Sequence, residues 1–401
     1  MTFGFKNHFI QVQIKMDLKM TNAPDTSNMA KLDNWRTTPH SKWAFHHVRE
    51  IIPSADIQNS CKNIAHLSDN TTSFEHINLS QVMDETETDA VVITQNDTIL
   101  FEKYNNGMNK GSPHILFSVS KSILGLLVGT LVDSNELKED DLVVKFIPEL
   151  DNTAYSDATI RDLLDMRVGV EFDEDYTAIS GPIVSYRHAA NWNPVPPGVD
   201  AGDLKSFMSC LTERDGEHGG RFHYVSPNTD ILAWVCERAS GTCYADLLSE
   251  RLWVPLGAEF PGYITVDRLG GARAAGGVCF TPRDLARVGL LVANGGYYND
   301  KQIIPKNWID DIIENGSDDA WKNRNGMDEF GNMPMHYRSF WYVQKDGDPL
   351  IHGLGIHGQY LFIDPKLNLS ISWFSSDNDA TGSPYMLKVM EAVNLIRNKL
   401  K

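Results

Sequence analysis

A long apolar run extends from Ile123 to Val132, directly after the segment Ser118-Val119-Ser120-Lys121-Ser122. A serine in front of an apolar run is typical of the first turn of a helix. We therefore expect a helix that begins near Ser118. Side chains three residues apart share one face of a helix, so this helix would hold Ser118 and Lys121 next to each other.

Apolar segments bounded by turn residues predict strands near both ends of the chain. Residues 90–93 and 98–101 flank Gln95-Asn96-Asp97, which is a hairpin signal. Three later segments alternate or run apolar like the strands of an antiparallel sheet, namely residues 337–344, 359–364 and 369–374. These strands predict one sheet built from both ends of the chain.

The middle of the chain, residues 135–255, has a mostly helical pattern. Thr159 is a good N-cap for residues 160–164, and residues 230–235 form another helical run. Between them, residues 169–201 contain four prolines and several aromatic residues, which favours an ordered lid over a linker. Two further helices are expected, at residues 282–293 and 385–400.

This order of elements predicts an α+β protein, with an antiparallel sheet flanked by helices and a mostly helical region beside it. We expect a loosely ordered arm at residues 1–30. The sheet domain would comprise residues 31–134 and 256–401, with residues 135–255 inserted as the helical region that carries the lid.

Composition and charge narrow the choice of partner. Over 401 residues the chain is 42% hydrophobic and 10% aromatic, as expected for a globular protein with a full core. Its net charge of -17 argues against nucleic acid, which needs a basic surface. No apolar stretch approaches the ~18 residues of a membrane span, and residues 1–20 lack the apolar core of a signal peptide. We therefore expect a cytoplasmic protein with no membrane partner, and the choice between monomer and homodimer stays open.

The cysteine pattern of the sequence indicates neither a disulfide framework nor a metal site. The five cysteines are scattered and form no C-x-x-C, so neither a disulfide framework nor a zinc site is indicated. We predict no metal and no cofactor.

The helix that begins at Ser118 carries the candidate catalytic groups. A serine hydroxyl is a weak nucleophile until a base removes its proton. Lys121 can be that base if burial lowers its pKa enough to make it neutral. The helix N-terminus adds exposed N–H groups and the positive end of its dipole. The S-x-x-K pattern alone is weak evidence, since such patterns arise by chance about once in a chain of this length.

Two further features could complete such a site. Tyr224 directly precedes a predicted helix, and beside a lysine ammonium it could pass a proton to the leaving group. An oxyanion hole needs two backbone N–H groups, of which Ser118 supplies one. The glycine-rich segment 353–359 leads into a strand and could supply the other. The alternatives are a tyrosine that only packs and a plain loop.

Several motifs in the same order resemble the serine beta-lactamase-related family, and among its members the 6-aminohexanoate-dimer hydrolases. The motifs are Phe117-Ser118-Val119-Ser120-Lys121-Ser122, Asp162-Leu163-Leu164-Asp165-Met166, Tyr224-x-Ser226-x-Asn228-Thr229-Asp230, Gly276-Gly277-x-x-x-Thr281-x-x-Asp284-Leu285-Ala286-Arg287 and Gly355-Ile356-His357-Gly358-Gln359. The stretch from Trp35 to Phe45 also resembles the N-terminal part of these amidases.

The resemblance implies the beta-lactamase/transpeptidase-like fold and a role for each matching residue. Ser118 would be acylated, Lys121 would be the base and Tyr224 the proton donor and acceptor. The N–H groups of Ser118 and Ile356 would form the oxyanion hole. Tyr176 would hydrogen-bond the scissile amide, and the remaining candidates for substrate binding are Arg187, Asn228 and His357.

The chain also departs from the family pattern at two places. Gly353-Leu354-Gly355 replaces the Lys-Thr-Gly that grips the carboxylate of a beta-lactam, so lactamase activity is not expected. Arg187 and His188 lie where related amidases can place an acidic residue that meets the ammonium group of the substrate.

We therefore expect a serine hydrolase that cleaves small linear amides or esters through an acyl-enzyme. A carboxylesterase of the same family is the first alternative, and a catalytically silent ligand-binding module is the second. A penicillin-binding peptidase is less favoured because cell-wall substrates lie outside the cytoplasm. A metallohydrolase would have to use His352 and His357, but no H-E-x-x-H motif supports it.

Overall fold

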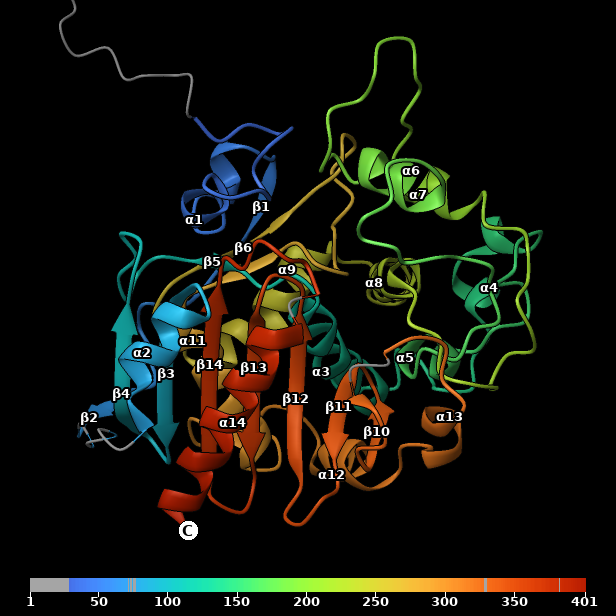
Figure 1. The fold of residues 1–401 in the computed structure, drawn as a ribbon. Coiled ribbons are helices and arrows are strands. Elements are labelled where there is room, and N and C mark those ends of the chain that lie inside the picture. Colours follow the sequence, from blue (N-terminus) through green and yellow to red (C-terminus); the bar gives the residue numbers. More distant parts are fainter. Residues whose placement is uncertain (1–28, 71, 73, 75–76, 328–329, 382) are drawn as a thin grey trace, which may run out of the picture.

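The computed structural model describes residues 29–401 except 71, 73, 75–76, 328–329 and 382. Within this part of the chain the largest element is an eight-stranded sheet (Figure 1). All neighbouring strands are antiparallel except β2, which joins β4 in parallel. The strand order is β10 (Met335–Arg338), β11 (Trp341–Gln344), β12 (Leu350–Gly355), β13 (Gln359–Asp364), β14 (Leu369–Ser375), β3 (Thr88–Gln95), β4 (Thr98–Tyr104) and β2 (Ser68–Asp69).

The sheet joins the two ends of the chain, as the strand pattern predicts. β3 pairs with β14, with Ile93 opposite Ile371. The predicted hairpin is confirmed between β3 and β4, and Asn96 in its turn has the left-handed φ of 51° that asparagine tolerates well. The arm predicted for residues 1–30 lies, up to residue 28, outside the described residues.

The single strand predicted for residues 337–344 is wrong. The chain turns at Ser339 and Phe340, which have φ of 48° and 65°, and the segment forms two antiparallel strands, β10 and β11. The apolar pattern continues through the turn because Ser339 and Phe340 are themselves buried. The Phe340 carbonyl accepts the hydroxyl of Ser122, so this turn contacts the helix that follows Ser118.

A second, smaller sheet has no counterpart in the sequence prediction. Its strands are short and come from distant parts of the chain, in the order β1 (Ser54–Ile57), β6 (Gly262–Thr265), β7 (Val278–Phe280) and β5 (His114–Ile115). β5 ends two residues before Phe117, so this sheet delivers the chain to the start of the next helix. A further two-stranded piece consists of β8 (Tyr297–Tyr298) and β9 (Lys301–Gln302).

Helices cover both faces of the main sheet (Figure 1). α11 (Pro282–Ala293) and α3 (Val119–Asp133) lie on one face, while α2 (Leu79–Glu85) and α14 (Ser383–Leu400) lie on the other. Residues 119–131 of α3 are all buried, because its other side faces the helical region. Burial on every side explains why this helix has a continuous apolar run in place of an amphipathic pattern.

The helical region follows α3 along the chain and lies beside the sheet in Figure 1. Thr159 caps α5 and forms a capping box with Asp162, which confirms the predicted N-cap. The lid segment is ordered by α6, which begins at Pro182. The helices of this region are α4 (Val143–Phe146), α5 (Ile160–Leu164), α6 (Pro182–Ala189), α7 (Leu204–Met208), α8 (Ser226–Ser240), α9 (Tyr244–Leu248) and α10 (Val254–Leu256).

The remaining helices are α1 (Ser41–Ala44), α12 (Lys306–Glu314) and α13 (Asp318–Lys322), with single turns at 48–50, 148–150 and 249–253. Among the described residues, no helix combines the length and the apolar character that a membrane span requires.

Candidate active site

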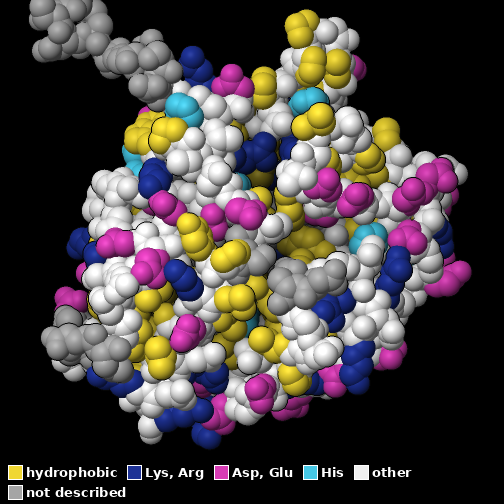
Figure 2. All heavy atoms as spheres, viewed as in Figure 1, with side chains coloured by type: hydrophobic (Ala, Val, Ile, Leu, Met, Phe, Trp, Pro, Cys, Tyr) yellow, Lys and Arg dark blue, Asp and Glu magenta, His cyan; other side chains and the backbone are white. Residues whose placement is uncertain are grey.

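A cavity of about 790 Å³ opens where the lid, the end of β12 and the loop after β14 meet. Its walls include residues 173–177, 354–358 and 378–381, together with Ser118 and Tyr224. Figure 2 shows the hollow on this face, with basic side chains in its upper part and hydrophobic ones below them. The apolar wall is formed by Met327, Phe330, Tyr342, Tyr360 and Met386.

Ser118 and Lys121 meet at this cavity. Nζ of Lys121 lies 2.8 Å from Oγ of Ser118 and 2.7 Å from the carbonyl oxygen of Ala275. Lys121 is only 1% exposed. Burial lowers the pKa of Lys121 from 10.5 to about 7, against the opposing effect of the Glu174 carboxylate. A lysine with this pKa is partly neutral near pH 7 and can accept the proton of a serine hydroxyl.

The backbone just before Ser118 is strained. Phe117 has a φ of 43°, in the left-handed region that a bulky residue rarely adopts. Its ring stacks on Trp35 at a centroid distance of 6.1 Å and meets Phe45 and Trp192 edge-on. This packing offsets the strain and fixes the sharp bend from β5 into α3 that presents Ser118 to the cavity.

Tyr224 lies one residue before Val225, the N-cap of α8, and its ring is next to the Ser-Lys pair. Nζ of Lys121 is 4.9 Å from the centroid of the Tyr224 ring. Burial raises the pKa of Tyr224, and the Glu174 carboxylate adds to this, while a hydrogen bond with Ser118 acts in the opposite direction. Tyr224 therefore keeps its proton at neutral pH and can donate it.

The backbone after β12 approaches Ser118 closely. A methyl group on Gly355 would lie 2.6 Å from the Leu116 carbonyl oxygen and 3.0 Å from the Ser118 nitrogen. Only glycine fits there, so the close approach of Ile356 to the start of α3 depends on Gly355. The backbone N–H groups of Ser118 and Ile356 have no acceptor among the described residues.

His357 lines the cavity and anchors the turn that carries Ile356. Its Nδ1 lies 2.7 Å from the Asp377 carbonyl oxygen, and its backbone N–H donates to the Ala380 carbonyl at 2.9 Å. Burial lowers the pKa of His357 to about 4, so the ring is neutral near pH 7. The ring packs beside Phe117 at 5.3 Å, which ties the two halves of the proposed oxyanion hole together.

Tyr176 lines the cavity and contacts Glu174, which lines it too. The sequence pattern did not indicate a role for Glu174. The Tyr176 hydroxyl donates to the Glu174 carboxylate at 3.0 Å, so its oxygen remains free to accept a further hydrogen bond. Glu174 also accepts the backbone N–H of Ser226 at 2.7 Å and the hydroxyl of Ser226. The side chain of Ser226, at the first position of α8, therefore holds the lid to that helix.

Of the other two predicted substrate-binding residues, Arg187 lines the cavity and Asn228 does not. Arg187 on α6 lines the cavity, is 9% exposed, and donates to the carbonyls of Asp175, Tyr176 and Ala178. Asn228 is not among the residues that line the cavity. It is fully buried, and its side-chain oxygen accepts the hydroxyl of Tyr155 at 2.9 Å. The prediction that Asn228 contacts the substrate is corrected to a supporting role beneath the site.

A chain of hydrogen bonds from α8 positions the base. Oδ1 of Asp230 accepts the backbone N–H of Ala275 at 2.8 Å, and the carbonyl of Ala275 in turn accepts Lys121. Oδ2 of Asp230 lies 2.5 Å from Arg273 and 2.5 Å from the Tyr186 hydroxyl. Asp230 belongs to one of the sequence motifs, but only the structure links it through Ala275 to Lys121.

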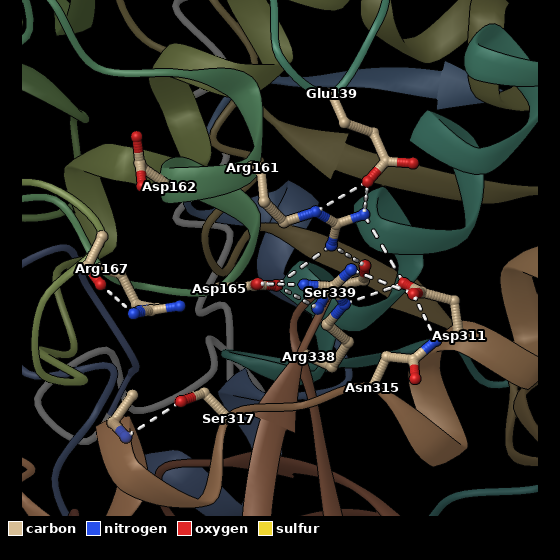
Figure 3. A network of polar contacts seen from close by, with 12 residues as sticks. Glu139, Arg161, Asp162, Asp165, Arg167, Asp311, Asn315, Ser317, Arg338 and Ser339 are labelled. Atoms are coloured by element: carbon tan, nitrogen blue, oxygen red, sulfur yellow. Dashed lines mark hydrogen bonds and ion pairs between the residues drawn. The ribbon is translucent and has the colours of Figure 1, made fainter.

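A network of ion pairs joins the segment of α5 to β10 and α12 (Figure 3). Arg161 and Arg338 both contact Asp165 and Asp311, and the backbone N–H of Ser339 donates to Asp165 at 3.0 Å. These contacts hold the turn at Ser339 and Phe340. The Phe340 carbonyl accepts the hydroxyl of Ser122 at 2.7 Å, one residue after Lys121.

No group of three or more His, Cys, Asp or Glu side chains in the described part of the chain could hold a metal ion. His352, one of the two histidines considered for a metal, is buried inside β12 against Phe362 and is not in the cavity wall.

Comparisons with known proteins identify the family of the chain. The family model described as Beta-lactamase matches residues 78–389. The chain is 33% identical over 350 residues to the 6-aminohexanoate-dimer hydrolase of Paenarthrobacter ureafaciens, which covers 86% of this chain and 88% of that protein.

Solved structures show the same fold. One from Bacillus anthracis, described as a candidate 6-aminohexanoate-dimer hydrolase, superposes with a TM-score of 0.83 at 26% identity, covering 94% of this chain and 99% of that chain. An octameric penicillin-binding protein homologue from Pyrococcus abyssi has a TM-score of 0.61 at 17% identity, covering 80% of this chain and 76% of that one, and this likeness concerns the fold alone.

Proposed function

The chain belongs to the beta-lactamase family of serine hydrolases, and we propose that it cleaves small linear amides of the 6-aminohexanoate-oligomer type, or the corresponding esters, through an acyl-enzyme on Ser118. The observation that carries this proposal is the 2.8 Å contact between Ser118 Oγ and the buried Lys121 amine. The 33% identity to a 6-aminohexanoate-dimer hydrolase supports the substrate class.

Acylation begins when the neutral Lys121 amine accepts the proton of Ser118 Oγ. The oxygen forms a bond to the carbonyl carbon, and the carbonyl oxygen gains negative charge. The N–H groups of Ser118 and Ile356 have no other acceptor in the described structure and are the proposed oxyanion donors. The hydrogen bond that Lys121 donates to the Ala275 carbonyl keeps its amine directed toward Ser118.

The leaving amine needs a proton as the carbon–nitrogen bond breaks. Tyr224 is the proposed donor, because its raised pKa keeps the hydroxyl protonated and Lys121 lies next to its ring. The Lys121 ammonium then returns its proton to Tyr224, so both groups end acylation in their starting forms. Water releases the acyl group by the same steps in reverse, with Ser118 as the leaving group.

A comparison of steady-state rates tests the proposal. A panel of linear amides and 4-nitrophenyl esters is assayed with the unaltered protein, Ser118→Ala and Lys121→Met. We expect turnover of members of both classes by the unaltered protein. Each substitution should lower kcat by about 10³-fold or more, as for removal of a nucleophile or its base. Turnover that persists in Ser118→Ala would refute the proposal.

A further inference from the structure

Beside Ser118 the cavity narrows into a recess of about 30 Å³, lined in part by Arg36, Arg187 and Arg273. This space can hold one or two water molecules or a carboxylate group, since one water needs about 10–15 Å³ on the same scale. Arg36 and Arg187 also line the main cavity, so the recess adjoins it.

The three arginines are incompletely paired. Arg273 forms an ion pair with Asp230 at 2.5 Å, but its buried Nε has no hydrogen-bond partner among the described residues. Within the same part of the chain, Arg187 donates to backbone carbonyls alone. Arg36 donates to the side-chain oxygen of Asn193. Burial and the nearby charges of Arg187 and Arg273 lower the pKa of Arg36 to about 9, yet the group stays charged near pH 7.

Two carboxylates offset part of this charge. Asp230 compensates Arg273, and Glu174, which lines the recess, can compensate one of the other two arginines. Among the residues that the structure describes, one positive charge therefore remains without a partner in the recess. Isolated buried charges are costly unless an opposite charge is present, so the recess is built to receive an anion.

The position of Tyr224 indicates which half of the substrate would face the recess. Ser118, Ile356 and Tyr176 line the recess, whereas Tyr224 lines the main cavity. Since Tyr224 is the proposed proton donor to the leaving group, the leaving half of the substrate extends toward it. The acyl half is then the half that faces the arginines.

We propose that this enzyme selects substrates whose acyl half ends in a carboxylate, such as the monoamides and monoesters of linear dicarboxylic acids. This inference rests on the proposed function and specifies its substrate class. The carboxylate would accept hydrogen bonds from Arg36 and Arg187, with the Nε of Arg273 as a third donor. An acyl half that ends in an ammonium would be repelled.

The acidic residues of the cavity do not contradict this charge preference. Asp33, Asp173, Asp175 and Asp379 line the main cavity, but none lines the recess. All four are exposed, so water and salt screen their charge. Contacts inside the recess therefore decide which acyl group is accepted.

Three esters of equal chain length test the proposal, namely mono-4-nitrophenyl adipate, 4-nitrophenyl hexanoate and 4-nitrophenyl 6-aminohexanoate. They differ only in the negative, neutral or positive end of the acyl half. For the unaltered protein we expect kcat/KM for the adipate ester to exceed that of the hexanoate ester by about tenfold, the scale of one charge-assisted hydrogen bond. The 6-aminohexanoate ester should be the poorest substrate.

Arg36→Gln and Arg187→Gln should each lower the ratio of kcat/KM for the adipate ester to kcat/KM for the hexanoate ester by about tenfold. The matched control is Arg268→Gln. Arg268 is exposed, lies outside the cavity, and like Arg187 donates to a lid carbonyl, that of His188 at 2.8 Å. If loosening of the lid were the cause, Arg268→Gln would show the same loss, and the hexanoate rate would fall in all three variants.

Binding of adipate to Ser118→Ala, followed by calorimetry, tests the recess without turnover. We expect adipate to bind to Ser118→Ala. Binding should be lost when Arg36→Gln is combined with Ser118→Ala, and kept when Arg268→Gln is combined with it. Equal rates for the adipate and hexanoate esters, or adipate binding that survives Arg36→Gln and Arg187→Gln, would overturn the inference. Failure of the proposed function would give a different result from failure of this inference, because hexanoate turnover would then not depend on Ser118.

Discussion

The Glu174 carboxylate accepts the backbone N–H of Ser226 at 2.7 Å, two residues after Tyr224. This contact joins the lid to the start of α8 and places a negative charge beside the catalytic groups. The same carboxylate opposes the lowering of the Lys121 pKa by burial. It also adds to the raising of the Tyr224 pKa. Glu174 therefore links the lid to the proton transfers of the proposed mechanism.

Replacement of Glu174 by glutamine should shift the pH profile of the enzyme. Lys121 must be neutral to act as a base, so kcat/KM falls as the pH drops below its pKa of about 7. Glu174 stabilises the ammonium form, and its loss lowers that pKa. The acid limb should move to lower pH by about one unit, as measured by kcat/KM for a 4-nitrophenyl ester.

The control for this shift is Glu171→Gln, which removes the same charge from an exposed position on the same segment. It should leave the acid limb in place. A limb that stays in place in Glu174→Gln, or moves equally in both variants, would show that Glu174 does not influence the base.

Tyr176→Phe should impair amides more than esters. The Tyr176 hydroxyl donates to Glu174, so its oxygen can accept the N–H of the scissile amide. An ester has no N–H to donate at that position. We expect the barrier for amide cleavage to rise by about 1–3 kcal/mol and the barrier for esters to change less. Paired substrates with the same acyl group measure the difference, and equal losses on both would exclude this role.

Hydrolysis of beta-lactams should be poor. A family anchor for the lactam carboxylate would have to stand at Gly353, but a β-carbon there would meet Val119 at 3.1 Å and Ser122 at 3.3 Å. The arginine recess does not replace this anchor, because a lactam carries its carboxylate on the side of the ring nitrogen. Nitrocefin should be turned over far more slowly than 4-nitrophenyl hexanoate, and comparable rates would count against this conclusion.

Lys121 should reduce the stability of the protein. Its pKa is 10.5 when exposed and about 7 in the folded state, so between these values the unfolded chain binds a proton that the folded chain does not. Stability therefore rises with pH across this window, and the cost of Lys121 is complete below pH 7.

Lys121→Met should consequently raise the free energy of unfolding at pH 7 by roughly 2 kcal/mol, less than the full linkage energy because the Ala275 carbonyl loses its donor. The gain should shrink as the pH approaches 10.5. Urea unfolding of both proteins across this range measures it, and a gain independent of pH would contradict a buried, neutral Lys121.

Local patterns were enough to predict the groups that share one helix or one turn. Ser118 and Lys121 could be identified because their spacing on a helix brings them together whatever the rest of the fold. The hairpin around Asn96 could be predicted for the same reason. Tyr224 and Ile356 required the family resemblance, because nothing local indicates that they approach Ser118.

Contacts between residues that are far apart in the sequence could not be predicted from local patterns. In the sequence, Glu174 is one of several acidic residues in the lid. Only the fold brings its carboxylate within hydrogen-bond distance of Ser226. Arg36 and Arg273 are more than 200 positions apart, yet they line one recess. Asn228 was assigned to the substrate because it follows Tyr224 in a motif, but one turn of α8 directs it to Tyr155 instead.

The central claim is that Ser118 carries the acyl group during turnover, and mass spectrometry of the acid-quenched enzyme tests it most directly. After brief exposure to 4-nitrophenyl hexanoate, a peptide that contains Ser118 should gain the mass of one hexanoyl group, and fragmentation should place it on that residue. Ser118→Ala should show no adduct. An adduct on a different residue, or rapid turnover of the ester by Ser118→Ala, would contradict the claim.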